Sequence, residues 1–152
     1  MGHNQKGGRS HIRPAVPEDL PQILVVERLC FDKQWQESEF RPALRDIFFV
    51  YEEDQILGFI IACCCEIAKK GVIMRVAVHP EAQGRGIASQ LMQKALNILR
   101  ERNVTCVELD VEITKTDVKR LYEKFGFKTL KVVNIDSDYE NDAFYIMKLR
   151  FV

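Results

Sequence analysis

The sequence predicts an α/β fold, in which a mixed, mostly antiparallel and twisted sheet of about six to seven strands is flanked by about four helices. Three observations predict it. Runs rich in β-branched and aromatic residues recur along the chain. Residues 85–102 place apolar side chains at helical period, and a predicted strand enters that helix through a loop that contains two glycines.

The length and composition fit one globular domain. The chain has 152 residues, of which 47% are hydrophobic and 29% charged, a balance that allows a buried core. Residues 1–10 contain three glycines and little apolar content, so we expect a disordered lead-in followed by one domain over 11–152.

The charge balance excludes some partners. Lys plus Arg and Asp plus Glu both number 22, so no overall basic field favours nucleic acid or a membrane surface. The longest apolar stretch, 56–65, is about half of the roughly 20 residues of a membrane span, and no signal peptide is recognisable. We expect a cytoplasmic protein that is a monomer or a homodimer.

The cysteines and histidines indicate no metal site. The five cysteines form no C-x-x-C pair and the three histidines are scattered. Cys63, Cys64 and Cys65 lie in an apolar run, and we expect these thiols to be buried and reduced rather than reactive.

The first half predicts short elements before a meander. A strand over 12–15 precedes a helix over 17–31, whose first turn contains proline and acidic residues. A second helix over 35–46 is interrupted by Pro42. Strands over 47–52, 56–65 and 71–78 follow, and a turn at Glu53 and Asp54 separates the first two.

The second half alternates helices and strands. The amphipathic pattern over 85–102 predicts the longest helix, and 104–111 predicts a strand. A helix over 116–125 ends at Gly126, which takes the C′ position. Strands over 127–133 and 143–149 close the fold.

The segment 74–88 predicts an anion-binding loop. A strand ends at Val78, a loop with Gly84 and Gly86 follows, and a helix begins, so unpaired N–H groups face one space at a positive dipole end. Arg85 adds charge. The glycines alone also fit a helix-entry turn without a ligand. A Walker loop needs Gly-Lys-Ser/Thr, which is absent here. A dinucleotide fingerprint needs Gly or Ala at position 89, where this chain has Ser. The sequence therefore favours neither of these two phosphate-binding motifs.

Gln83-x-x-Gly86-x-Ala88 resembles the Q/R-x-x-G-x-G/A signature of the GNAT superfamily of N-acetyltransferases. The resemblance extends from 12–20 to the segment Leu121-Tyr122-Glu123-Lys124-Phe125-Gly126-Phe127, and so covers nearly the whole chain after residue 10. Leu109-Asp110-Val111-Glu112 is similar to the Leu-Glu-Val-Arg segment of the ribosomal-protein N-terminal alanine acetyltransferase group.

The resemblance implies a GNAT fold with acetyl-CoA as cosubstrate. Central strands are then expected to splay, so that the backbones of Val76 and Val78 pair with the pantetheine amides. Lys115 stands where the family often has an Asn that contacts the cofactor, and could pair with a CoA phosphate or point to water. The implied cofactor-binding residues are Val76, Ala77, Val78, Gln83, Gly84, Arg85, Gly86, Ile87, Ala88, Ser89 and Lys115.

Amide formation from a thioester needs a neutral amine and a protonated leaving group. The resemblance implies that Tyr122 is the general acid at the CoA sulfur. Asp110 matches the position of the family's catalytic Glu but is one methylene shorter, so we expect it to act as base through a water. A carboxylate at a strand end is also a common cap partner, and Glu112 on the same side is the substitute.

The same group suggests an acceptor groove. Glu27, Phe31, Trp35 and Tyr139 are candidate substrate-binding residues, with Phe40 beside them, although Glu27 also fits a solvated helix charge and the aromatics also fit a core. The Tyr-Tyr pair that typically grips a peptide N-terminus is missing, with Asn134-Ile135 near its position.

Three functions remain open at this stage. The first is acetylation of protein or peptide N-termini by direct attack in a ternary complex, and the second is acetylation of a small-molecule amine or a lysine side chain. The third is a CoA-binding module without catalysis, against which Tyr122 and a nearby carboxylate argue.

Overall fold

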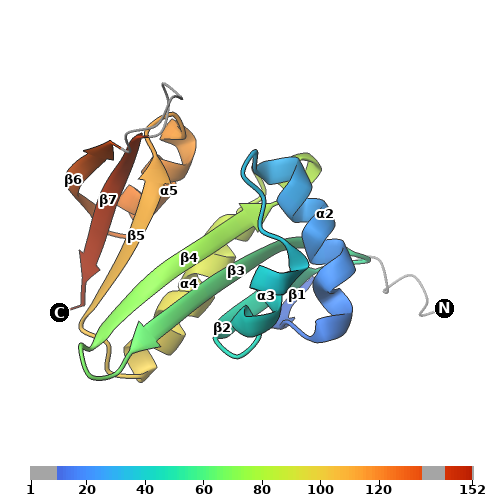
Figure 1. Ribbon diagram of the computed structural model, residues 1–152, viewed down its shortest axis with the longest axis horizontal. Coiled ribbons are helices and arrows are strands. Elements are labelled where there is room, and N and C mark those ends of the chain that lie inside the picture. Colours follow the sequence, from blue (N-terminus) through green and yellow to red (C-terminus); the bar gives the residue numbers. More distant parts are fainter. Residues whose placement is uncertain (1–9, 135–142, 152) are drawn as a thin grey trace. The chain divides into compact units, whose positions relative to one another are not determined.

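The computed structural model describes residues 10–134 and 143–151. Seven strands form one sheet in the order β1-β2-β3-β4-β5-β7-β6 (Figure 1). The described chain divides into two compact units, one made of 10–63 and 74–98 and the other of 64–73, 99–134 and 143–151. No helix in the part of the chain that the structure describes is long and apolar enough to cross a membrane.

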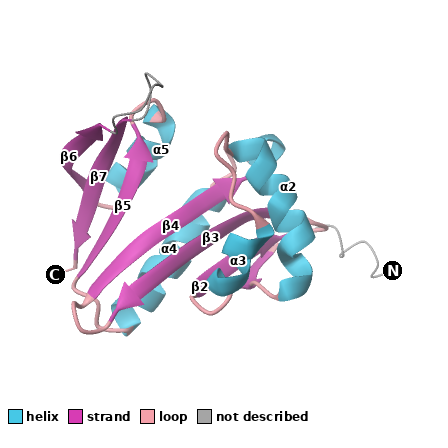
Figure 2. Ribbon diagram, in the orientation of Figure 1, coloured by secondary structure: helices cyan, strands magenta, loops and turns pink. Residues whose placement is uncertain are grey.

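The first unit is built on antiparallel strands. β1 pairs with β2 and β2 pairs with β3, with a register shift between Tyr51 and Glu52. Helices α2 and α3 cover one face of these strands and α4 covers the other (Figures 1 and 2). The elements that lie wholly or mainly in this unit are β1 (His11–Pro14), η1 (Pro17–Asp19), α2 (Leu20–Cys30), α3 (Glu37–Ala43), β2 (Ile47–Glu52), β3 (Ile56–Cys65), β4 (Lys70–Val78), η2 (Pro80–Ala82) and α4 (Ile87–Glu101).

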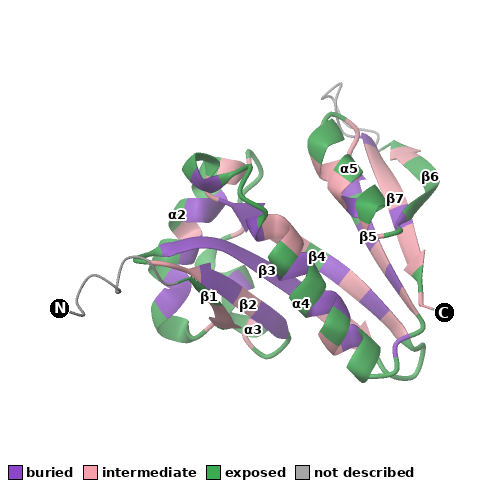
Figure 3. Ribbon diagram, turned by 180° about the vertical axis from the view of Figure 1, so that it is seen from behind, coloured by how far each residue is buried: buried purple, intermediate pink, exposed green. Residues whose placement is uncertain are grey.

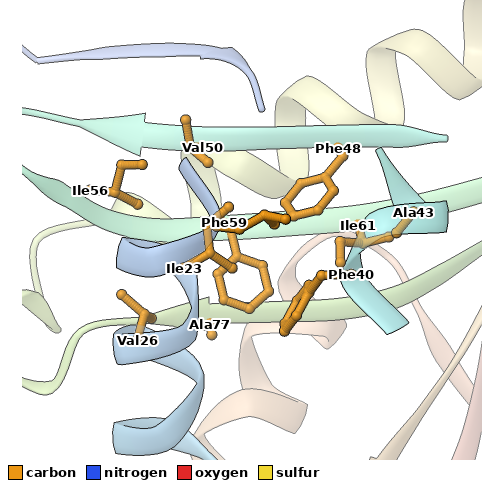
Figure 4. Close-up of a cluster of buried hydrophobic side chains, with 11 residues drawn as sticks. Ile23, Val26, Phe40, Ala43, Phe48, Val50, Ile56, Phe59, Ile61 and Ala77 are labelled. Carbon is orange, nitrogen blue, oxygen red and sulfur yellow. The ribbon is translucent and has the colours of Figure 1, made fainter. Parts of the chain in front are cut away.

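A buried aromatic cluster fixes α2 and α3 on the sheet (Figure 4). Phe40 of α3 lies edge-on to Phe59 of β3, with ring centroids 5.6 Å apart, and Phe48 of β2 stands 6.1 Å from Phe59. Ile23 and Val26 of α2 complete the same cluster. Truncation of one such phenylalanine costs about 3–5 kcal/mol in typical cores, so this cluster holds the α2–α3 segment firmly.

The opposite face of β3 is packed closely by α4. A Cβ built on Gly58 would stand 2.9 Å from the carbonyl oxygen of Ala77 and 3.3 Å from side-chain atoms of Ile87 and Leu91. Residues 56–62 of β3 are all buried (Figure 3). The first turn of α4 is therefore anchored by packing beneath it.

The second unit is built on β5 (Cys106–Glu112), α5 (Thr116–Lys124), β6 (Lys128–Asn134) and β7 (Ala143–Arg150). β7 pairs antiparallel with both β5 and β6. The parallel pairing of β4 with β5 covers only Lys70–Val72 and Cys106–Glu108, so it ends before either strand ends.

Prolines explain where the helices differ from the sequence prediction. The helix predicted over 17–31 is a 3-10 turn followed by α2, and Pro21 sits in the first turn of α2, where its missing N–H is not needed. Pro42 lies inside α3 one residue before its last residue and does not interrupt it. Tight bonds from Leu44, Arg45 and Asp46 to carbonyls three residues earlier then close the chain into β2.

The prediction of buried cysteines in β3 is wrong. Cys63 and Cys64 are partly exposed and Cys65 is exposed, because the strand leaves the core as it approaches the turn before β4. None of the five cysteines, all of which lie in the described part of the chain, forms a disulfide bond.

Candidate active site

The loop between β4 and α4 has the geometry of an anion cradle. Gly84 and Gly86 adopt φ values of +82° and +80°, in the left-handed region that favours glycine. A Cβ built on either glycine would meet nothing within 4 Å, so the space beside the loop is open. His79 shapes the loop's entry by accepting the N–H of Glu81 at Nδ1, 3.1 Å away.

Backbone N–H groups at the start of α4 are available to a ligand. The N–H of Gln90 donates to the carbonyl of Gly86, the residue just before α4. The N–H groups of Ile87, Ala88 and Ser89 come before this bond, in the first turn, where a helix offers its N–H groups no carbonyl partner of its own. The side chain of Ile87 is buried, which leaves only its backbone to bind. Open space, left-handed glycines and a helix N-terminus together fit the diphosphate of a CoA-type cofactor.

Arg85 is paired with an acid within the same unit. Its guanidinium contacts Glu53 in the turn between β2 and β3, and Tyr51 donates its hydroxyl to the same carboxylate at 3.2 Å. Binding of a phosphate by Arg85 would therefore compete with Glu53. The sequence showed the arginine but not this partner, 32 residues away.

The end of β4 is partly committed to protein contacts. The carbonyl of Val78 accepts the thiol of Cys30 and the side-chain amide of Gln83, both at 3.1 Å. Gln83 thus braces the loop against the strand. Val76 is partly exposed, whereas the side chains of Ala77 and Val78 are buried, so these two can offer a ligand only their backbones.

Tyr122 is positioned by the end of α5. Gly126 has φ +99°, its N–H bonds the carbonyl of Glu123, and the N–H of Phe127 bonds the carbonyl of Tyr122 at 3.1 Å. These are the two bonds of a Schellman motif. The ring of Phe127 packs 5.9 Å from the Tyr122 ring, so the predicted C′ glycine also fixes the phenol.

The Tyr122 phenol stays protonated in the folded protein. Only 5% of the residue is exposed, yet no group within the described residues hydrogen-bonds its hydroxyl. Burial raises the pKa of Tyr122 strongly, and the negative charge of Asp110 raises it further. Because the neutral form is favoured, Tyr122 keeps its proton throughout the neutral range.

Asp110 and Glu112 share one side of β5. Val107, Leu109 and Val111 are buried, and the acidic residues alternate with them. Asp110 is exposed, and its carboxylate forms no ion pair among the described residues. Glu112 is partly exposed, and its backbone carbonyl accepts the N–H of Lys115 at 3.0 Å. Of these two carboxylates, Asp110 is the one whose charge contributes to the raised pKa of Tyr122.

Glu27 is not the solvated helix charge that the sequence also allowed, and its carboxylate does not face open space. Its side chain is 0% exposed and forms an ion pair with Arg75 of β4, whose Nε donates to Oε1 at 2.9 Å. The other oxygen also accepts the backbone N–H of Trp35 at 2.8 Å. Full burial excludes direct contact between this carboxylate and an acceptor in the described conformation.

The aromatic residues separate into two classes. Phe40 is 0% exposed and belongs to the core, so its expected place in a groove wall is wrong. Phe31 and Trp35 are partly exposed and lie in the segment between α2 and α3. Their exposure is compatible with the groove wall that the sequence suggested. Tyr139 and Ile135 lie outside the described residues. Lys115 precedes α5 as its N-cap residue.

Arg75 is the residue that the sequence prediction missed. A lone arginine within the strand sequence Val72-Ile73-Met74-Arg75-Val76-Ala77-Val78 was a signal for a buried partner, because an unpaired charge is costly in such a setting.

Within the described chain no group of acidic, histidine and cysteine side chains is arranged to hold a metal ion.

Comparisons with known proteins place this geometry in one family. The model of the Acetyltransferase (GNAT) family matches residues 16–127. An N-alpha-acetyltransferase of Sulfurisphaera tokodaii is 28% identical over 144 residues, which cover 85% of this chain and 86% of that protein. The [ribosomal protein bS18]-alanine N-acetyltransferase of Haemophilus ducreyi is 28% identical over 124 residues, which cover 80% and 84%.

A solved structure shares the fold. Arabidopsis thaliana Naa50, in complex with the bisubstrate analogue CoA-Ac-MVNAL, superposes with a TM-score of 0.83 at 19% identity, over 93% of this chain and 99% of that one. At this identity the likeness concerns the fold alone, and the predicted arrangement of strands and helices is confirmed.

Proposed function

The chain belongs to the acetyltransferase (GNAT) family, and from this premise we propose that it is an acetyl-CoA-dependent N-acetyltransferase that acts on protein or peptide N-termini. The observation that carries the proposal is the Tyr122 hydroxyl, a phenol that keeps its proton, has no hydrogen-bond partner among the described residues and lies under the influence of Asp110. The names of the relatives, which denote N-alpha-acetyltransferases and ribosomal-protein alanine acetyltransferases, support an N-terminal acceptor.

We assign binding and chemistry to different elements of one domain, which we propose to span 11–152. The family match over residues 16–127 includes parts of both compact units, which supports a single domain. The N–H groups of Ile87, Ala88 and Ser89 would hold the diphosphate, and backbone groups of Val76 and Val78 would hold the pantetheine. Acetyl-CoA, when bound, supplies an acetyl group activated as a thioester.

Tyr122 and Asp110 would handle the protons of the reaction. Tyr122 holds a proton at Oη for the departing sulfur and stabilises its negative charge by hydrogen bonding. Asp110, acting through a water, accepts the proton that the acceptor nitrogen loses as it forms the amide. The transfer is then a direct attack within a ternary complex.

A covalent cysteine route is less well supported. Cys30 donates its thiol proton to the carbonyl of Val78, which stabilises the thiol rather than the nucleophilic thiolate. We expect intersecting initial-rate lines for acetyl-CoA and peptide.

An N-terminal amine suits this chemistry better than a lysine. Its reference pKa is about 8, against about 10.4 for lysine, so near pH 7 a larger fraction is neutral without a strong base. Acetylation of a small-molecule amine or a lysine side chain is the second candidate function, favoured by the exposed position of Asp110, which does not confine the acceptor to a peptide.

The test compares two matched peptides with acetyl-CoA, following thiol release. One peptide carries a free N-terminus on a small residue and no lysine, and the other has a blocked N-terminus and one internal lysine. We expect a higher kcat/KM for the first peptide. Equal or faster acetylation of the blocked lysine peptide contradicts N-terminal selectivity, and no acetylation of any amine contradicts the enzymatic assignment.

A further inference from the structure

Arg85 is the only Lys or Arg in the loop of residues 79–86, and a carboxylate of the protein already engages it. Its guanidinium forms an ion pair with Glu53, which lies in the turn between β2 and β3. The side chains of Arg85 and Glu53 are 48% and 21% exposed, so the arginine is the partner that solvent reaches more easily. The one cationic side chain of the loop is therefore directed to an internal anion.

Glu53 is held in place for this contact. Tyr51, which is only 5% exposed, donates its hydroxyl at 3.2 Å to the same oxygen of Glu53 that Arg85 contacts. The turn itself is fixed to α2, because the N–H of Ile56 donates to the side chain of Gln22 at 2.8 Å. A carboxylate that is already held in position loses little conformational freedom on pairing, so it competes well for an arginine.

The contribution of this ion pair to folding stability is small, because water screens pairs that are partly exposed. Its effect on anion binding is larger in kind. Arginine binds phosphate oxygens with its planar fork, and Glu53 occupies part of that fork. The carboxylate also repels an incoming phosphate and offsets the positive end of the α4 dipole. Both effects of Glu53 oppose the binding of a phosphate at the start of α4.

We propose that Glu53 is an internal competitor for Arg85, which lowers the affinity of the β4–α4 loop for the phosphate groups of CoA. The inference rests on the proposed function, which assigns those phosphates to this loop. Acetyl-CoA and CoA carry the same phosphate groups, so the competition weakens the binding of both by the same factor. It therefore favours the release of CoA after the acetyl group has been transferred.

The test measures the dissociation constants of CoA and acetyl-CoA by calorimetry, without an acceptor. Glu53→Gln removes the charge but keeps an oxygen that can accept the Tyr51 hydroxyl, and Tyr51→Phe removes only that hydroxyl. Asp54→Asn is the matched control, because it removes one negative charge from the next position of the same turn. Asp54 is exposed and forms no ion pair among the described residues. Thermal unfolding of each variant checks that it is folded.

We expect Glu53→Gln to bind both CoA and acetyl-CoA about four-fold more tightly than the wild type, as befits the loss of a partly exposed charge pair. Tyr51→Phe should bind both more tightly by a smaller factor. Asp54→Asn should stay within about 1.5-fold of the wild-type affinity. When Arg85→Gln is already present, adding Glu53→Gln should change the affinity no more than Asp54→Asn does, because the two charges act as a coupled pair.

Unchanged binding by Glu53→Gln overturns the inference, and weaker binding reverses it, since Glu53 would then orient Arg85 toward the phosphate. Equal tightening by Asp54→Asn, or by Glu53→Gln in the absence of Arg85, contradicts it as well, because either result indicates a general effect of charge. Tightening confined to acetyl-CoA also contradicts it.

The inference and the proposed function fail in different ways. Tighter binding by Glu53→Gln in a protein that acetylates no amine supports the competition and contradicts the proposed activity. Acetylation of N-terminal peptides by a protein in which Glu53→Gln leaves both affinities unchanged rejects the competition alone. Absence of CoA binding by the wild-type protein contradicts both.

Discussion

The β4–α4 loop and the end of α5 use different parts of the chain for function. In the loop, the proposed binding site consists of backbone groups: Gly84 and Gly86 leave the space beside the loop open, and we propose that the N–H groups of the first helical turn bind the ligand there. At α5 the proposed site is a side chain, the Tyr122 phenol, whose pKa is raised by burial and by the charge of Asp110. A backbone site follows from local sequence, whereas a side-chain site depends on its neighbours.

The largest effect should come from filling the backbone site. Gly86→Glu places a side chain at a φ of +80° and a negative charge beside the helix N-terminus. We expect acetyl-CoA binding to be lost in calorimetry, with cooperative thermal unfolding retained as the control for folding. Binding with unchanged affinity would show that the loop is only a helix-entry turn.

A smaller effect should separate the two carboxylates of β5. Asp110→Asn removes the charge that acts on Tyr122, and we expect kcat/KM at neutral pH to fall about 10²-fold, the lower end for loss of a general base. The N-terminal amine itself is partly neutral there, so the loss should shrink as the pH rises toward the amine pKa near 8. Glu112→Gln is the matched control and should change kcat/KM by less than about three-fold. The reverse ranking of the two variants would assign the base to Glu112.

The fold was predictable wherever the sequence pattern is local. The bounds of β2 and β3 agree with the predicted strands over 47–52 and 56–65, and Gly126 ends α5 as expected. The helix predicted from 85 begins at Ile87, because Gly86 is left-handed and cannot belong to the helix. Local turn chemistry thus determines both where helices end and where they begin.

The candidate site was less predictable where long-range partners decide a residue's role. Glu27 reads as a charged helix residue in sequence, but Arg75 of a distant strand converts it into a buried structural anion. The same holds for Arg85 with Glu53 and for the Val78 carbonyl with Cys30. Phe40 and Trp35 have the same aromatic character in sequence, and only packing separates the core residue from the partly exposed one.

The contrast between binding and chemistry is tested most directly by Tyr122→Phe, with turnover and acetyl-CoA affinity measured on the same preparation. The substitution removes only the hydroxyl, and the ring keeps its packing on Phe127. We predict that kcat falls by about 10² to 10⁴, the range for loss of a general acid, while the affinity for acetyl-CoA measured by calorimetry stays within about two-fold. Wild-type turnover in Tyr122→Phe, or a loss of acetyl-CoA affinity that accounts for the whole fall in rate, would contradict the assignment of chemistry to α5 and of binding to the glycine loop.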